Sequence, residues 1–188
     1  MKKMLMINGS PRSNGSSSEI LDIIAETASA KGFVCEKIDL GKLKISHCKA
    51  CMSCKSTGKC ATDDDMTALY EKIQDADALA FSVPVYFGME TGLFKNFLDR
   101  IYALVDRKDG VRTVRFGKKK IGVIVASCGA PDGNMIYHGM VSHLVMVVRS
   151  FGVDDISSGI IPSASPGKIR GTQFMNDVLS SFEFHLSL

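Results

Sequence analysis

Short apolar runs alternate with turns and amphipathic segments along this chain, and this alternation limits its possible folds more than any other feature. Apolar runs that predict strands lie at residues 3–7, 33–40, 78–83, 121–126 and 153–161. Helical spacing of apolar residues follows Ser16 and the acidic residues 63–65, and extends over residues 93–105, 135–151 and 173–186. Strands that alternate with helices in this way predict an α/β fold with a parallel sheet.

The number of expected strands also indicates their order. Five strands favour a flavodoxin-like three-layer sandwich with order 2-1-3-4-5 over the six-stranded dinucleotide-binding arrangement. Since 188 residues with 45% hydrophobic content normally form one globular unit, we expect a single domain over 1–188. Ligands of such sheets bind beyond the carboxyl ends of the strands, which directs attention to the turns there.

The turn after the first expected strand, residues 8–18, is rich in glycine and hydroxyl side chains. Backbone N–H groups, hydroxyls and a helix dipole can together surround a phosphate. The turn lacks the Gly-x-Gly-x-x-Gly and Gly-Lys-Ser/Thr patterns, so a terminal phosphomonoester fits best. The alternative is a solvated loop in which Ser16 and Glu19 form a capping box. The candidate phosphate ligands are Ser10, Arg12, Asn14, Ser16, Ser17 and Ser18.

Two further turns are expected at the same edge, and together they can hold a flat ring. The turn after the third strand offers Pro84, Val85, Tyr86, Phe87, Gly88 and Met89. The turn after the fourth offers Ser127, Cys128, Gly129, Asp132 and Gly133. Alternatively, Tyr86 and Phe87 pack beneath the following helix, and Cys128 serves only as a small residue. Three such turns at one edge favour a planar, phosphorylated cofactor.

Charge and hydropathy exclude two classes of partner. The formal net charge is +3, and the one tight basic run, Lys118 to Lys120, is expected to be the solvated entry to a strand. A nucleic-acid partner is therefore not expected. The apolar stretch ending at Ile7 is too short for a signal sequence or for a membrane span of about 20 residues. We expect a cytoplasmic protein without a membrane partner.

Four of the six cysteines lie close together in a segment, about 42–61, that is expected to be a loop between the second strand and the next helix, near the ligand-binding end of the sheet. In a reducing compartment, such clustering indicates metal or redox chemistry. The spacing Cys-x2-Cys-x2-Cys-x5-Cys is similar to that of ferredoxins and predicts a [4Fe-4S] cluster. Zinc, a disulfide and free thiols are the alternatives. The predicted ligands are Cys48, Cys51, Cys54 and Cys60.

Several of these segments together resemble the NADPH-dependent FMN reductase family, and in particular its iron–sulfur flavoprotein branch. The resemblance is carried by residues 8–12, the cysteine segment with residues 64–66, residues 84–87, and the run from Lys95 to Arg100. It implies FMN, with its phosphate on Ser10, Arg12 and residues 16–18. It places the isoalloxazine against residues 84–89 and 127–133. It also implies a homodimer or homotetramer with each flavin near a subunit interface.

These inferences predict an FMN-dependent oxidoreductase. A reduced nicotinamide, NADH or NADPH, or a ferredoxin-like donor would supply electrons, and a flavin, a quinone or an iron–sulfur centre would accept them. One alternative is an electron-transfer flavoprotein without substrate turnover of its own, and another is a flavin-free redox or metal sensor. No acid–base residue is nominated, and Tyr86 offers the one plausible hydroxyl beside the ring.

Overall fold

The computed structural model describes residues 1–108, 111–115 and 119–187. Its elements, with 3-10 helices written η, run in chain order as β1 (Lys2–Asn8), α1 (Ser16–Ala30), β2 (Phe33–Asp39), η1 (Leu40–Lys42), α2 (Ser53–Thr57), α3 (Met66–Asp75), β3 (Ala78–Pro84), α4 (Gly92–Ile101), η2 (Tyr102–Leu104), β4 (Val105–Lys108), β5 (Val111–Val114), β6 (Lys120–Ser127), α5 (Gly133–Ile136), α6 (His138–Arg149), β7 (Val153–Ile161) and α7 (Gln173–Leu186).

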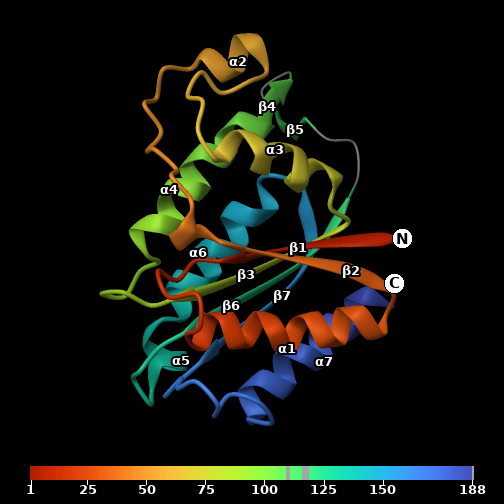
Figure 1. Cartoon of the computed structure of the whole chain (residues 1–188), viewed down its shortest axis with the longest axis vertical. Coiled ribbons are helices and arrows are strands. Elements are labelled where there is room, and N and C mark those ends of the chain that lie inside the picture. The colour runs from red at the N-terminus through yellow and green to blue at the C-terminus, as the bar shows by residue number, and fades with distance from the viewer. Residues whose placement is uncertain (109–110, 116–118, 188) are drawn as a thin grey trace.

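The main sheet has five parallel strands in the order β2-β1-β3-β6-β7. This is the predicted order 2-1-3-4-5, with the fourth and fifth predicted strands being β6 and β7. Helices α1 and α7 cover one face, and α3, α4 and α6 cover the other (Figure 1). The carboxyl ends of the strands therefore meet at one edge, on the side away from the labelled N-terminus.

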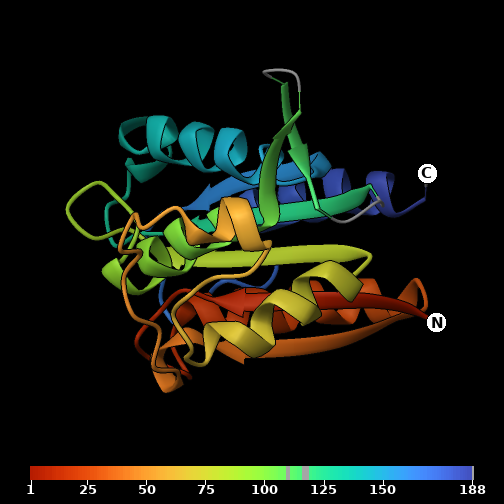
Figure 2. The same ribbon diagram turned by 90° about the horizontal axis from the view of Figure 1, so that it is seen from above.

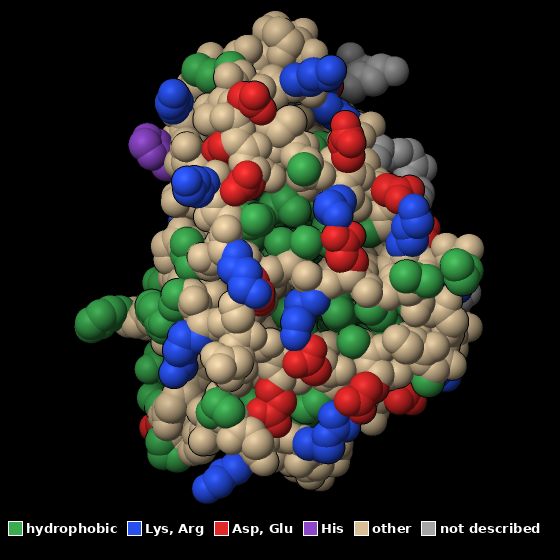
Figure 3. Space-filling view, in the orientation of Figure 1, with side chains coloured by type: hydrophobic (Ala, Val, Ile, Leu, Met, Phe, Trp, Pro, Cys, Tyr) green, Lys and Arg blue, Asp and Glu red, His purple; other side chains and the backbone are tan. Residues whose placement is uncertain are grey.

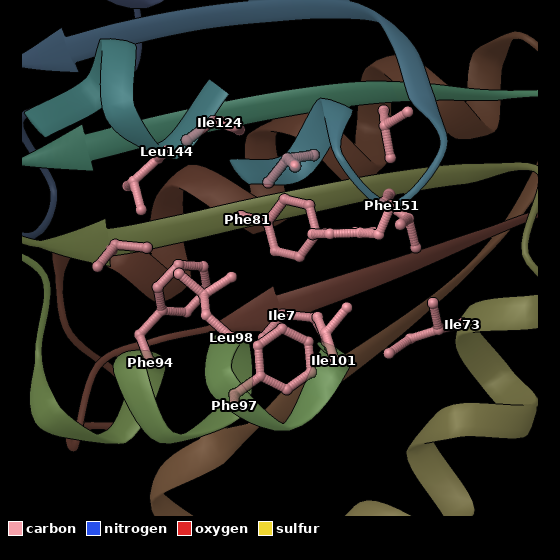
Figure 4. Packing of buried hydrophobic residues seen from close by; sticks show 14 of the residues in the cluster. Ile7, Ile73, Phe81, Phe94, Phe97, Leu98, Ile101, Ile124, Leu144 and Phe151 are labelled. Carbon is pink, nitrogen blue, oxygen red and sulfur yellow. The ribbon is translucent and has the colours of Figure 1, made fainter. Parts of the chain in front are cut away.

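Alternation of side chains along the strands divides the core into two layers. On β3, Leu79 and Phe81 face α4 and α6, whereas Ala78 and Ala80 face α1 and α7. Phe81 is at the centre of the first layer, with its ring centroid 5.9 Å from that of Phe94 (Figure 4). This packing fixes the helix that begins directly after the second turn.

The structure departs from the predicted elements in the middle of the chain. The helix expected over 93–105 ends at Ile101, and an antiparallel hairpin of β4 and β5 follows it. Branched valines at both ends of this hairpin favour the extended backbone. The cysteine segment contains the short helix α2, which lies beside the hairpin (Figure 2). The helix expected over 135–151 is divided at Tyr137 into α5 and α6.

The prediction that the basic run is solvated is wrong for Lys120. Its side chain is buried, and its ammonium donates hydrogen bonds to the carbonyls of Gln74, at 3.0 Å, and Ala76. It therefore satisfies carbonyls at the end of α3 that have no partner within the helix. Lys119 is exposed, and Lys118 lies outside the described residues. Among the described helices, none is both long and apolar enough to cross a membrane.

Candidate functional site

Hydrogen bonds tie the three predicted turns to one another at the carboxyl edge of the sheet. Gly9 N donates to Ser82 O at 2.8 Å, which joins the ends of β1 and β3. Thr91, at the start of α4, donates from its hydroxyl to Gly9 O at 2.6 Å. A Cβ at position 9 would lie 3.0 Å from the Phe94 ring, so glycine allows the first turn to rest directly on α4.

The third turn joins the other two through Ser127. Val85 N donates to Ser127 O at 2.9 Å, and the hydroxyls of Ser17 and Ser127 lie 3.1 Å apart. Both serines are buried. The start of α1, the second turn and the third turn therefore form one connected edge, as the sequence predicts.

The first turn leaves the N-terminus of α1 without a cap from any side chain of the described chain. Gly15 is the N-cap residue, so the predicted capping box of Ser16 and Glu19 is wrong. The Glu19 carboxylate instead accepts a hydrogen bond from Gly167 N at 2.6 Å. Residues 16–18 place three buried hydroxyls around this helix end. Such an end attracts an anion through its N–H groups and dipole.

Two residues that sequence reasoning missed shape the first turn. Asn8 Oδ1 accepts from Ser10 N at 3.1 Å, while Asn8 Nδ2 donates to Asp39 Oδ1 at 2.9 Å. Partial burial opposes ionisation of Asp39, but hydrogen bonds from Lys42, Asn8 and Ser13 hold its pKa below the usual range. The carboxylate therefore stays charged and fixes the Asn8 amide, which in turn orients the Ser10 backbone.

The remaining first-turn candidates lie around this frame. Ser10 is buried, and its hydroxyl accepts a hydrogen bond from Arg12 N at 3.1 Å. The Arg12 and Asn14 side chains are exposed at the mouth of the turn. Lys37 Nζ donates to Ser18 Oγ at 3.0 Å and forms an ion pair with Asp22 at 2.5 Å. Lys42 in turn pairs with Asp39, so Arg12 is the candidate of this turn that can offer a charge-assisted hydrogen bond to an anion.

The second turn is a tight hairpin that projects from the molecule. Tyr86 N donates to Met89 O at 2.8 Å, and Met89 N donates to Tyr86 O at 3.1 Å. Phe87 and Gly88 have φ of 51° and 83°, the left-handed backbone that a type I′ turn needs. Phe87 is fully exposed. The alternative in which these aromatics pack beneath the next helix is therefore wrong, because Phe94 occupies that core position.

The third turn encloses Cys128. Its Sγ lies 3.5 Å from Ala130 O and 3.9 Å from Ile161 O, and a Cβ at position 133 would lie 2.0 Å from it. Burial raises the pKa of the Cys128 thiol. Gly133 therefore gives the sulfur its space. This supports the small-residue role for Cys128.

The four clustered cysteines line one cavity of about 440 Å³. Its walls include Leu98, Tyr102 and Phe151, at the C-terminal ends of α4 and α6. The sequence suggests a position near the carboxyl edge of the sheet, and the structure corrects this. Helix α4 begins just after the second turn, and its last four residues line the cavity, from a rise of about 9 Å along the helix. The thiols and the three turns are therefore separate sites.

Arg100 is buried beneath the cysteine segment. Its guanidinium donates to both oxygens of Asp64, at 2.7 and 3.1 Å, to Ser46 O at 3.0 Å and to Thr62 O at 3.1 Å. Its Nε is buried and has no hydrogen-bond partner among the described residues. Partial burial would raise the pKa of Cys60, but the Thr62 N–H, the Tyr70 hydroxyl and this guanidinium together lower it.

The middle of the segment is held by two more cations. Lys55 Nζ donates to Tyr102 O and Val105 O, each at 2.5 Å, and lies 3.5 Å from the Tyr102 ring centroid. Arg115, directly after β5, donates to Cys54 O at 3.1 Å. The hairpin that sequence reasoning missed therefore anchors α2.

The thiol segment fits a thiolate-ligated cluster in the chemistry of its donors. Four free thiols share one cavity, the pKa of one of them is lowered, and a buried N–H of Arg100 has no acceptor beside them. No group of three or more His, Cys, Asp or Glu in the described ranges already converges on a single metal position. Ligation would therefore draw the exposed Cys48 and Cys51 inward from their present positions.

Comparison with known proteins places this geometry in context. An iron-sulfur flavoprotein of Archaeoglobus fulgidus is 27% identical over 188 residues, covering 96% of this chain and 80% of that protein. An iron-sulfur flavoprotein of Methanosarcina thermophila is 32% identical over 132 residues, covering 70% of this chain and 65% of that protein. The solved NAD(P)H:quinone oxidoreductase from Methanothermobacter marburgensis has a TM-score of 0.73 at 19% identity, covering 98% and 97% of the two chains, which shows the fold.

A family model supplies the assignment. The model described as NADPH-dependent FMN reductase matches residues 2–159, a range that contains the three turns and the cysteine segment. It ends within β7, so the last two residues of that strand, the loop after it and α7 lie beyond the match. The predicted resemblance is thereby confirmed: this chain is an oxidoreductase that belongs to the NADPH-dependent FMN reductase family.

Proposed function

We propose that the carboxyl edge of the sheet binds FMN, with the phosphate at the start of α1. The observation that carries this proposal is the uncapped helix end surrounded by the buried hydroxyls of residues 16–18. Backbone N–H groups there, the Ser10 hydroxyl and the Arg12 guanidinium would donate to the phosphate oxygens. Asn14 lies at the mouth of the same turn.

The isoalloxazine would lie between the second and third turns. Pro84, Val85, Tyr86, Phe87, Gly88 and Met89 would border one side. Ser127, Cys128, Gly129, Asp132 and Gly133 would border the other. The hydrogen bond between Val85 N and Ser127 O holds the two borders together. The buried carboxylate of Glu90 has an oxygen without a partner among the described residues, which leaves a free acceptor beside this turn.

Bound FMN supplies the redox chemistry, by accepting a hydride from reduced NADH or NADPH, or electrons from a ferredoxin-like donor. The protein holds the ring edge open at the exposed hairpin, where Tyr86 and Phe87 can contact a second flat molecule. The hydrogen bonds of the second and third turns would position the ring for such a contact. A flavin, a quinone or an iron–sulfur centre would receive the electrons.

We propose that the cysteine segment holds a [4Fe-4S] cluster through Cys48, Cys51, Cys54 and Cys60. Such a cluster supplies one-electron transfer when bound. The cations Lys55, Arg100 and Arg115 around the segment would offset the charge of four thiolates. The names of the two curated relatives support this proposal.

The proposed assembly is a homodimer or homotetramer with the flavin edge at the interface. The second turn exposes Phe87 and Met89, and α5 exposes Met135 and Ile136 close by. Hydrophobic side chains gather along the same margin of the molecule in Figure 3. An exposed apolar patch of this kind is typical of a protein interface.

Turnover by the anaerobically purified protein tests this proposal. Oxidation of NADH or NADPH with a quinone or free flavin as acceptor supports the reductase. Its absence, together with rapid reduction by ferredoxin, would favour the carrier without substrate turnover. A colourless protein that binds no FMN would contradict both and leave a thiol-based sensor.

A further inference from the structure

We infer that Arg100 is the positioning residue of the cysteine segment: its buried guanidinium joins the two ends of the segment and so holds the thiols at the cavity. Its place at the end of α4 makes this possible. Ser46 lies two residues before the first clustered cysteine, and Thr62 lies two residues after the last. The carbonyls of both accept from the same guanidinium, at 3.0 and 3.1 Å.

Asp64 completes this closure. Its carboxylate accepts from Arg100 in a bidentate arrangement, and Asp64 Oδ2 also accepts from Ser46 N at 2.9 Å. Arg100 and Asp64 therefore contact both the N–H and the carbonyl of Ser46. Joining the ends of a loop removes much of its conformational freedom, so the cysteines between them are held over a limited space.

The chemistry of the contact requires an arginine. Only a planar guanidinium offers five donors in a fixed fork, and here four hydrogen bonds use the two terminal nitrogens. These four hydrogen bonds all go to residues 46–64, at the two ends of the segment. The Arg100 side chain is only 1% exposed, so loss of the fork removes the donors that the Ser46 and Thr62 carbonyls and the Asp64 carboxylate have at this point.

The remaining donor of Arg100 points to the same role. Its Nε is buried, lacks a partner in the described chain, and belongs to a residue that lines the cavity with the thiols. A sulfur atom bound in this cavity could accept a hydrogen bond from this N–H. This step rests on the proposed cluster, whereas closure of the segment does not.

A matched set of variants tests the inference on the full chain. Arg100→Lys keeps the charge and removes the fork, and Asp64→Asn removes the carboxylate charge. Arg170→Lys is the control, because Arg170 makes the same bidentate pair with Glu26 but both side chains are more than 60% exposed. Trypsin cleavage at Lys49, Lys55 and Lys59, iron per chain and FMN per chain are measured for each.

In Arg100→Lys we expect cleavage within the segment to accelerate by roughly tenfold or more. Iron affinity should fall by about 10- to 100-fold, as for other residues that orient metal ligands. FMN per chain should match the wild type and the Arg170→Lys control. General destabilisation would lower FMN and iron together, so this split, with a shifted reduction potential of any remaining cluster, identifies a positioning role.

The inference is overturned if the segment of Arg100→Lys is as protected as that of the wild type and holds as much iron. Should Arg100→Lys fail to fold, Asp64→Asn decides: intermediate cleavage supports the inference, and wild-type cleavage contradicts it. A wild-type protein without iron would contradict the proposed cluster alone, because cleavage then still tests the closure by Arg100.

Discussion

The flavin edge and the cysteine segment are built in different ways. At the flavin edge, strand ends that are already fixed by the sheet are joined by short backbone and hydroxyl hydrogen bonds, such as that between Ser17 and Ser127. The cysteine segment has little regular structure and is held by side chains from distant elements, above all Arg100. The flavin edge is therefore positioned by the sheet itself, whereas the cysteine segment is positioned by side-chain contacts to other elements.

This difference implies that each site can be lost without the other. About 9 Å of α4 lies between the second turn and the first α4 residue that lines the cavity, and the guanidinium of Arg100 donates to the two ends of the segment. Changes in one site should therefore leave cofactor content at the other unchanged. Measuring FMN and iron in the same variant tests this independence.

The largest expected effect is loss of iron from Cys60→Ser. Cys60 has the lowered pKa among the clustered thiols, and a serine hydroxyl does not replace a thiolate ligand. Iron per chain should fall to about a tenth of the wild-type value or less. Cys35→Ser is the control, since Cys35 lies half-buried in β2. Equal loss of iron in Cys60→Ser and Cys35→Ser would contradict the assignment of Cys60 as a cluster ligand.

The next effect concerns the phosphate site. The double variant Ser10→Ala/Arg12→Ala removes a hydroxyl and a cation, and we expect the Kd for FMN to rise by about 100-fold. Iron per chain should not change. Flavin fluorescence titration measures the Kd, and Arg170→Ala serves as a control for the loss of an exposed arginine. Unchanged FMN affinity would place the phosphate elsewhere.

A smaller effect is expected from Asp39→Asn, through the Asn8 amide. Because the folded pKa of Asp39 is lowered, its charge stabilises the fold fully above the ordinary carboxyl pKa of about 3.9, and this stabilisation is lost as the pH falls through the lower, folded value. The variant should lose about 1–2 kcal/mol near neutrality. Urea unfolding of both proteins from pH 7 to pH 3 should show this difference shrinking. A difference that grows on acidification would contradict the assignment.

The smallest change in stability is expected from Phe87→Ala, because the side chain is fully exposed on a hairpin. Its free energy of unfolding should stay within about 0.5 kcal/mol of the wild type. Phe97→Ala, in the core, should cost about 3–5 kcal/mol. If Phe87 lies at the proposed interface, sedimentation should show a weaker oligomer in Phe87→Ala. A fully retained oligomer would remove this residue from the interface.

The sequence predicts the flavin edge better than the cysteine segment for a physical reason. Strand and helix periodicity determine which turns share an edge, so the three turns follow from local pattern. The contacts of Asp39 with Asn8, of Arg100 with Asp64 and Ser46, and of Lys120 with Gln74 join residues 31 to 54 positions apart, and no local pattern reveals such partners. The sequence does show an acidic residue before a helix, Asp64, and a cation beside an apolar helical stripe, Arg100. Neither pattern predicts that these two side chains contact each other.

Local sequence patterns also do not predict the contacts and backbone conformation of several individual residues. The Ser16 and Glu19 spacing matches a capping box, yet the Glu19 carboxylate accepts a hydrogen bond from Gly167 N, 148 positions along the chain. The valines of β4 and β5 are too few to stand out from the preceding helix. Ala50 and Met52 adopt φ of 51° and 58° within the cysteine segment, a conformation that only tertiary structure imposes on such residues.

Cofactor analysis of the anaerobically purified wild type tests the flavin edge and the cysteine segment together. We predict one FMN per chain, with about four iron and four sulfide, and a visible spectrum in which flavin bands are superimposed on a broad absorption. Flavin without iron or sulfide would contradict the cluster and leave the flavin edge intact. A protein without flavin, which also fails to bind added FMN, would contradict the account of the edge.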